Sequence, residues 1–190
     1  MARAGLTVAR LTEAAADMAD DIGFENVTVL AVARSFGVKD ASLYSHIKNL
    51  RDLRQRVAVA SLAELADRVS DAVAGRAGKD ALVAFAGAYR DYAHEHPGRY
   101  ASTSFELDSE AALNSDAWRH SQLSRSILRA YRLTEPDETD AVRLMGSTFH
   151  GFIALEASGG FSQGRGRKSE QSWLRVLDVL HHALENWPSS

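Results

Sequence analysis

Residues 28–48 decide the fold, and they read TVLAVARSFGVKDASLYSHIK. Ala33 is followed by Gly37 after four residues and by Leu43 after a further six. Two helices that cross at a steep angle need a small residue at their closest approach, and the turn between them needs the positive φ that glycine adopts readily. Leu43 would pin the second helix by its apolar side chain. The spacing therefore predicts a helix-turn-helix, although any helical hairpin can use these residues in the same way.

The second helix of this motif, at about residues 40–47, is short and dense in hydrogen-bonding side chains. So small a helix is not explained by burial, and we interpret its polar face as a surface that reads DNA. Thr28 begins the preceding helix and offers a hydroxyl and backbone N–H groups to a phosphate. The alternative is a solvated charged surface, which we favour for Arg54 alone. The residues expected to contact DNA are Thr28, Lys39, Ser42, Tyr44, Ser45, His46 and Lys48.

The rest of the chain has the apolar periodicity of amphipathic helices, so we predict an all-α fold. A first helix over about residues 8–22 is ended by Gly23, and Thr28 and Asn49 are the expected N-caps of two later helices. The helix that starts near Leu50 is long enough to join two units. Further helices are expected at about 82–96, 114–132, 137–157 and 169–187, with a glycine-rich loop at 158–168.

Composition limits the function classes that remain. The chain has 190 residues, no cysteine and a net charge of −3, so disulfides and thiolate metal sites are excluded, and indiscriminate nucleic-acid binding is disfavoured. No signal peptide or long apolar segment is apparent, which predicts the cytoplasm. The main rival of another class is an enzyme. Its candidate groups are His94-Glu95-His96, His120-Ser121 and His181-His182. His94 and His96 are two apart, unlike zinc-ligand pairs, and His181 and His182 are better explained as surface residues near a helix C-terminus, so we expect no catalytic residue, no cofactor and no metal site.

The motif resembles the DNA-binding module of the TetR family of bacterial regulators. The resemblance is carried by GFENVTV at 23–29, GV at 37–38 and SLYSH at 42–46. It implies that Ser42, Tyr44 and His46 lie on a recognition helix, that Tyr44 meets the DNA backbone and that Thr28 contacts a phosphate. The family often has Lys where this chain has Leu50 and Phe where it has Ile47, so Lys48 is expected to replace the usual phosphate contact.

Three later segments resemble the TetR-type C-terminal domain named for a Trp-His-Gly motif. They are YRDYA at 89–93, HPGRY at 96–100 and FHGFIALE at 149–156, with Phe149 in place of the Trp. The resemblance implies a DNA-binding domain at 1–49 and an effector-binding and dimerisation domain at 50–190. It further implies a homodimer that represses transcription at a pseudo-palindromic operator and is released by a small molecule. A dimeric regulator without small-molecule control is the alternative.

Aromatic and polar residues of the second region are candidates to line an apolar effector pocket with a few hydrogen-bonding groups. Each of them could equally be ordinary core. The candidates are Tyr89, Tyr92, Tyr100, Phe105, Trp118, His120, Met145, Phe149 and His150. The apolar faces of the last two helices predict a homodimer interface, with a larger monomeric core as the alternative. The interface candidates are Phe152, Ile153, Trp173, Leu177, Leu180 and Leu184.

Overall fold

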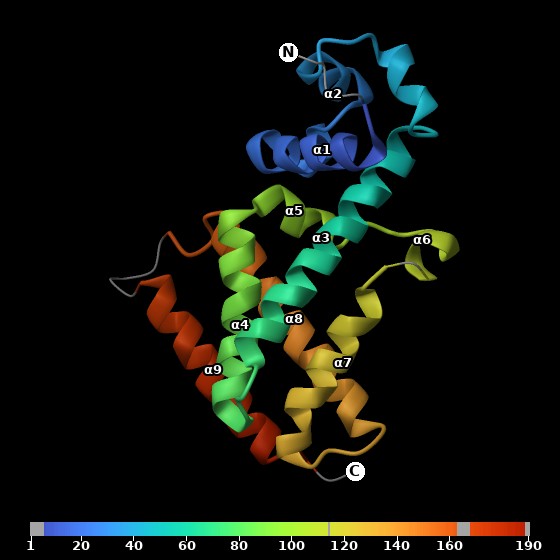
Figure 1. Ribbon diagram of the computed structural model, residues 1–190. Coiled ribbons are helices and arrows are strands. Elements are labelled where there is room, and N and C mark those ends of the chain that lie inside the picture. Colours follow the sequence, from blue (N-terminus) through green and yellow to red (C-terminus); the bar gives the residue numbers. More distant parts are fainter. Residues whose placement is uncertain (1–5, 114, 163–167, 189–190) are drawn as a thin grey trace. The chain divides into compact units, whose positions relative to one another are not determined.

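The computed structural model describes residues 6–113, 115–162 and 168–188, and all regular secondary structure within them is helical (Figure 1). The all-α prediction is therefore confirmed. The elements in chain order are α1 Val8–Ile22, η1 Phe24–Asn26, α2 Val29–Ser35, η2 Asp40–Ser45, α3 Leu50–Val73, α4 Gly78–Glu95, α5 Pro97–Ser102, α6 Ser109–Leu113, α7 Ala117–Leu128, η3 Arg129–Tyr131, α8 Asp137–Ala157 and α9 Ser169–Glu185, where η marks a 3-10 helix.

The local rules that predicted the first helices hold in the structure. Gly23 ends α1 with a φ of 89°, and its N–H donates to the carbonyl of Ala19. Thr28 caps α2, since its hydroxyl oxygen accepts a hydrogen bond from the N–H of Ala31 at 3.1 Å. Asn49 caps α3 in the same way by accepting from the N–H of Asp52 at 2.9 Å. The short helices α5 and α6 were not predicted from the sequence.

The chain forms two compact units, and the helices α3 and α4 each contribute to both. Unit 1 comprises residues 1–65 and 92–117, and unit 2 comprises 66–91 and 118–190. Residues 92–117 join unit 1 because Arg99 pairs with Asp20 of α1 and Phe105 packs edge-on against Phe24. These units differ from the division at residue 49. The division at residue 49 separates the expected DNA-binding and effector-binding functions, whereas the two units are defined by compactness. The functional division remains a prediction.

The core of unit 1 lies beneath the predicted helix-turn-helix. Leu11 and Ala15 of α1, Val32 and Ala33 of α2, and Leu43 of η2 are completely buried there. Leu53 and Val57 of α3 complete this core. In unit 2 the interior is formed by apolar side chains of α4, α8 and α9. Among them, the ring of Phe149 contacts the ring of Phe85 on one side and that of Trp173 on the other.

Candidate nucleic-acid interface and ligand cavity

The turn between α2 and η2 has the geometry that its sequence predicts. Gly37 has a φ of 66°, and its N–H donates to the carbonyl of Arg34 at 3.0 Å. The N–H of Val38 donates to the carbonyl of Ala33 at 3.1 Å, so the small residue lies where the chain reverses. An L-residue in place of Gly37 would be strained at this φ, although there is open space around it.

The second helix of the motif, predicted at about residues 40–47, is the 3-10 helix η2 and ends at Ser45. The N–H groups of Ser42 and His46 donate to carbonyls three residues earlier, at 3.0 and 2.8 Å. Short polar side chains compete with the backbone here, because Ser45 donates its hydroxyl to the carbonyl of Ser42 and Asp40 accepts from the N–H of Ala41.

The polar face of η2 is exposed while its apolar anchor is buried. Leu43 has no exposed surface, whereas 54% of Tyr44 is exposed. Lys39, Ser42 and Ser45 are also exposed, and His46 is half-buried. The fold thus presents the predicted side chains together on one short segment. Thr28 is exposed at the start of α2, and since its oxygen accepts the capping bond, its hydroxyl hydrogen is available for a phosphate.

The start of α3 places Lys48 at the surface and turns Leu50 inward. The backbone N–H of Lys48 donates to Asp52 at 2.9 Å, which fixes the position from which the exposed ammonium extends. Leu50 is half-buried and packs against the core of unit 1. A side chain at position 50 therefore serves packing in this chain. This explains why the chain has leucine at a position where the TetR family often has lysine. Lys48 is then the candidate cation for the phosphate contact.

Arg54 serves the fold of unit 1 and does not lie on the solvated charged surface that was favoured for it, because only 18% of its side chain is exposed. Its guanidinium donates to the carbonyl of Glu25 at 2.7 Å and pairs with the carboxylate of Glu25 at 3.2 Å. It also lies over the ring of Phe24, 5.6 Å from the centroid. Arg51 is held by residues outside the helix-turn-helix as well, because it donates to the carbonyl of Glu106 and lies over Phe105.

A cluster around Arg99 joins α5 to the C-terminal half of α1, and the sequence assigned it no role. The backbone N–H of Arg99 donates to Asp20 at 2.8 Å, and the other oxygen of Asp20 lies 3.0 Å from Nδ1 of His96. The guanidinium pairs with Asp17, with Asp20 at 3.2 Å and with Glu64 of α3 at 3.2 Å. The available signal was that Asp17 and Asp20 fall off the apolar stripe of α1.

Unit 2 contains a cavity of about 190 Å³ between α4, α7 and α8. Its apolar walls come from Phe85, Val142, Met145 and Phe149, and Gly146 leaves room on the α8 side. Its polar groups come from Tyr89, His120, Ser121, Ser124 and His150. An apolar enclosure with a few polar groups is typical of small-molecule sites.

Several polar groups of this cavity contact one another. The hydroxyl of Tyr89 lies 2.7 Å from Nδ1 of His120, and burial raises the pKa of Tyr89. Ser124 donates its hydroxyl to the carbonyl of His120. The ring of His150 meets Tyr89 edge-on, and withdrawal from water together with the neighbouring His120 lowers the pKa of His150. The cavity therefore favours the neutral imidazole of His150 as a hydrogen-bonding group.

The structure brings five of the sequence-predicted pocket residues together in this cavity and separates the other four. Tyr89, His120, Met145, Phe149 and His150 line it. Trp118 lies in the first turn of α7 with 56% of its surface exposed. The remaining three belong to unit 1: Tyr92, whose hydroxyl donates to Glu64 of α3, Tyr100 and Phe105.

The six residues expected at a dimer interface lie inside the chain's own core. Phe152 is 9% exposed and the other five, Ile153, Trp173, Leu177, Leu180 and Leu184, are 1–4% exposed. They pack within unit 2 and offer little surface to a second subunit. The apolar side chains that α8 and α9 leave at the surface are different ones: Leu144, Leu155, Leu174 and Val179, which are 39–60% exposed.

Neither a metal centre nor a membrane helix is found among the residues that the structure describes. Within them, no three His, Asp or Glu side chains are grouped in a way that could hold a metal ion. No helix in this part of the chain is both long enough and apolar enough to cross a membrane.

Comparisons with known proteins agree on one class of protein, the transcriptional regulators. Residues 82–180 match a family model described as the Tetracyclin repressor-like C-terminal domain. The HTH-type transcriptional regulator Rv0681 of Mycobacterium tuberculosis is 34% identical over 151 residues, which cover 78% of this chain and 69% of the relative. YobS of Bacillus subtilis, another HTH-type transcriptional regulator, is 33% identical over 162 residues, covering 85% and 84%. Both relatives are regulators of transcription, the class to which the family match also points.

A solved structure supports the fold independently of close sequence similarity. The Streptomyces coelicolor TetR family protein ActR, in complex with (S)-DNPA, superimposes with a TM-score of 0.71 at 16% identity, covering 97% of this chain and 100% of that one. The shared fold does not test the Trp-His-Gly subtype, which remains a prediction.

Proposed function

The chain belongs to the TetR family of DNA-binding transcriptional regulators, and we propose that it is a homodimeric repressor released from its operator by a small molecule. The observation that carries the proposal is the exposed polar face of η2 above the buried Leu43. Because that leucine is anchored in the core, the opposite side of the short helix faces outward, where a duplex can reach it. A regulator of this kind acts on the chromosome, so we assign it to the cytoplasm.

The DNA contacts divide into those that read bases and those that fix the protein on the backbone. Ser42 and His46 have side chains that can donate to or accept from base edges in the major groove. Tyr44 is the exposed hydroxyl best placed for the backbone. Thr28 and Lys48 flank the segment as phosphate contacts, while Lys39 and Ser45 lie at its edges. The exposure of these side chains supports this assignment.

A homodimer would place two recognition segments on one operator. In helix-turn-helix dimers the half-sites lie about 34 Å apart, one turn of the duplex, and the operator has matching two-fold symmetry. The exposed apolar side chains of α8 and α9, namely Leu144, Leu155, Leu174 and Val179, support an isologous four-helix interface. Burial of the six residues named from the sequence moves the proposed interface to this exposed set.

The cavity of unit 2 is the proposed effector site. Its volume of about 190 Å³ suits a small molecule, and its walls favour an apolar body with one or two hydrogen-bonding groups facing Tyr89, His120 and His150. ActR, which shares the fold, is solved in complex with (S)-DNPA. Release requires that the effector bind the operator-incompatible geometry better than the operator-bound one.

The experiment that tests this function is fluorescence anisotropy of the protein with DNA fragments that flank its own coding region. One fragment should bind far more tightly than random DNA, and its affinity should fall steeply with salt as counterions are released. In Lys48→Ala the salt slope should drop by about one, because one phosphate contact is lost. Binding that never distinguishes a fragment from random DNA would overturn the proposal. Specific binding that no small molecule alters would leave a repressor without effector control.

A further inference from the structure

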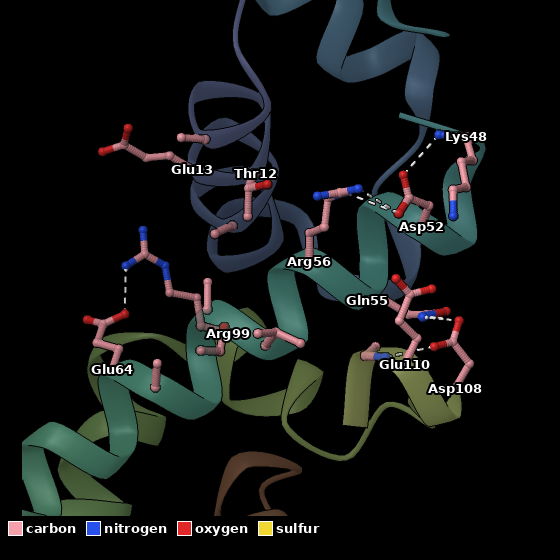
Figure 2. A pocket seen from close by; sticks show the side chains of 17 residues that line it. Thr12, Glu13, Lys48, Asp52, Gln55, Arg56, Glu64, Arg99, Asp108 and Glu110 are labelled. Atoms are coloured by element: carbon pink, nitrogen blue, oxygen red, sulfur yellow. Dashed lines mark hydrogen bonds and ion pairs between the residues drawn. The ribbon is translucent and has the colours of Figure 1, made fainter. Parts of the chain in front are cut away.

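A second, larger hollow lies wholly within unit 1. It has a volume of about 620 Å³ and is lined by one face of α1, the first half of α3, Arg99 of α5 and residues 108–111 around α6. Figure 2 shows Glu13 on α1, Asp52 and Arg56 on α3 and Asp108 beside α6 around this hollow. We call it the α1–α3 groove. Lys48, one of the proposed phosphate contacts, also lines it, whereas the cavity of unit 2 shares none of its lining residues.

The floor of the groove consists of small apolar side chains. Ala9 and Ala16 contribute from α1, and Val59, Ala60 and Ala63 contribute from α3. Because so many of these positions carry only a methyl group, the two helices do not fill the space between them. Such a floor favours the apolar body of a ligand, whose contacts would remove this surface from water.

The charged side chains around the groove favour a cation. Five carboxylates line it against three basic groups. Arg56 is already paired with Asp52 at 3.1 Å. Arg99 is surrounded by several carboxylates, including Glu64 at 3.2 Å. The guanidinium groups of Arg56 and Arg99 are therefore neutralised by their own neighbours, which leaves Lys48 as the remaining cation of the groove.

Two of the lining carboxylates keep their charge uncompensated by a cation. Asp108 accepts from Nε2 of Gln55 at 2.7 Å and from the backbone N–H of Ala111 at 2.9 Å, and both of these donors are neutral. Glu13 is exposed on α1 and forms no ion pair with any residue that the structure describes. Figure 2 shows Glu13 projecting from α1 and Asp108 from the chain just before α6, so the negative potential comes from two sides of the groove.

One buried polar atom of the groove also lacks a partner. Ser61 lines the groove and is 1% exposed, yet its hydroxyl has no hydrogen-bond partner among the described residues. A buried hydroxyl without a partner costs free energy, which a ligand could recover. We propose that the α1–α3 groove is a second ligand site, which takes an organic cation with an apolar body. The site is separate from the effector cavity, and its occupancy does not depend on the function proposed above.

The test is isothermal titration calorimetry of the full chain with octyltrimethylammonium, below its micelle-forming concentration. Octanoate, of equal chain length and opposite charge, is the matched ligand. In Ala60→Phe, a large side chain at an exposed lining position should fill the groove and weaken octyltrimethylammonium binding by at least about tenfold. Ala101→Phe makes the same change at an exposed position of α5 outside the groove and should bind like the unmodified chain. Glu13→Gln and Asp108→Asn should each weaken binding by up to about fivefold.

Binding at the groove can be distinguished from binding elsewhere on the chain. Binding of the cation alone, lost in Ala60→Phe and kept in Ala101→Phe, would support the site. Equal binding of octanoate, or binding unchanged in Ala60→Phe, would overturn it. Gly146→Leu fills the cavity of unit 2, so loss of binding in that variant alone would place the cation there and also overturn the proposal. None of these measurements involves DNA, so failure here leaves the repressor function untouched.

Discussion

Gly98 lies directly against the backbone of Ala19, so that a Cβ built on Gly98 would overlap with the carbonyl oxygen of Ala19. This contact joins the first turn of α5 to the end of α1. It brings Arg99 and His96 within reach of Asp20. The absence of a side chain at one position therefore allows the whole cluster around Arg99 to form.

Gly98→Ala should destabilise unit 1. The added methyl group meets rigid backbone and forces α5 away from α1, at a cost of about 1–3 kcal/mol in the free energy of unfolding. Gly87→Ala is the control, because that position lies within α4 and has open space around it. It should raise the free energy of unfolding by roughly 0.5–1 kcal/mol, since alanine favours the helix. Urea unfolding of both variants checks this, and equal effects would contradict the close approach.

The contact at Gly98 also shows which part of the fold the sequence could not predict. The N-cap at Thr28, the positive φ of Gly37 and the burial of Leu43 follow from rules that act over a few residues, and all three predictions are confirmed. The pairing of Asp20 with Arg99 joins residues 79 apart in sequence. Periodicity along either helix does not indicate such a pairing.

Among the candidate site residues, too, local features were predicted correctly and long-range packing was not. Helical spacing marks an apolar face but does not say whether the face packs within the chain or against a partner, and Leu177 and Leu180 prove to be core. Tyr89 and Tyr92 are three apart on α4, yet they belong to different compact units. The residues of η2 were predicted correctly as a surface set because one buried leucine fixes which side of a short helix faces outward.

Tyr44→Phe should weaken operator binding without changing stability. The hydroxyl is on an exposed side chain, so its loss costs the free protein little, whereas a lost hydrogen bond to the backbone would weaken binding roughly two- to tenfold. Tyr131→Phe is a control in which the same change removes a hydroxyl that serves the fold, because the Tyr131 hydroxyl lies 2.9 Å from Nδ1 of His181 within unit 2. It should lower the melting temperature and leave operator affinity unchanged. Anisotropy and thermal melts of both variants test the pair.

Gly146→Leu should abolish the response to the effector. The leucine would extend into the cavity of unit 2, where a Cβ on Gly146 meets no atom within 4 Å. Since leucine also favours the helix over glycine, by roughly 0.5–1 kcal/mol, the variant should fold at least as stably. Small apolar molecules that raise the melting temperature of the unmodified chain should have no effect on Gly146→Leu. Stabilisation that persists in this variant would place the effector elsewhere.

The stability of unit 2 should fall as the pH drops below about 6.5, and His150 should contribute to that loss. The pKa of His150 is lowered from its ordinary value of 6.5, by burial first and by His120 second. Above pH 6.5 the ring is neutral in both states and has no effect. Below it the unfolded chain binds a proton that the folded chain does not, so the free energy of unfolding decreases until the pH reaches the lowered pKa. His150→Gln should flatten this dependence in thermal melts from pH 5 to 8, and an identical slope would refute it.

Leu155→Glu and Val179→Glu should separate the proposed homodimer into monomers. Both side chains are more than half exposed on the single subunit, 54% and 60%, so a charge there disturbs no core contact. A charge buried at a subunit interface without a partner is costly, and in a two-fold interface each substitution occurs twice. Sedimentation should therefore show a lower mass and anisotropy a weaker operator complex. Leu113→Glu, at a position 85% exposed on α6, is the matched control and should remain dimeric. If all three variants sediment alike, the subunits meet through a surface other than the exposed apolar side chains of α8 and α9.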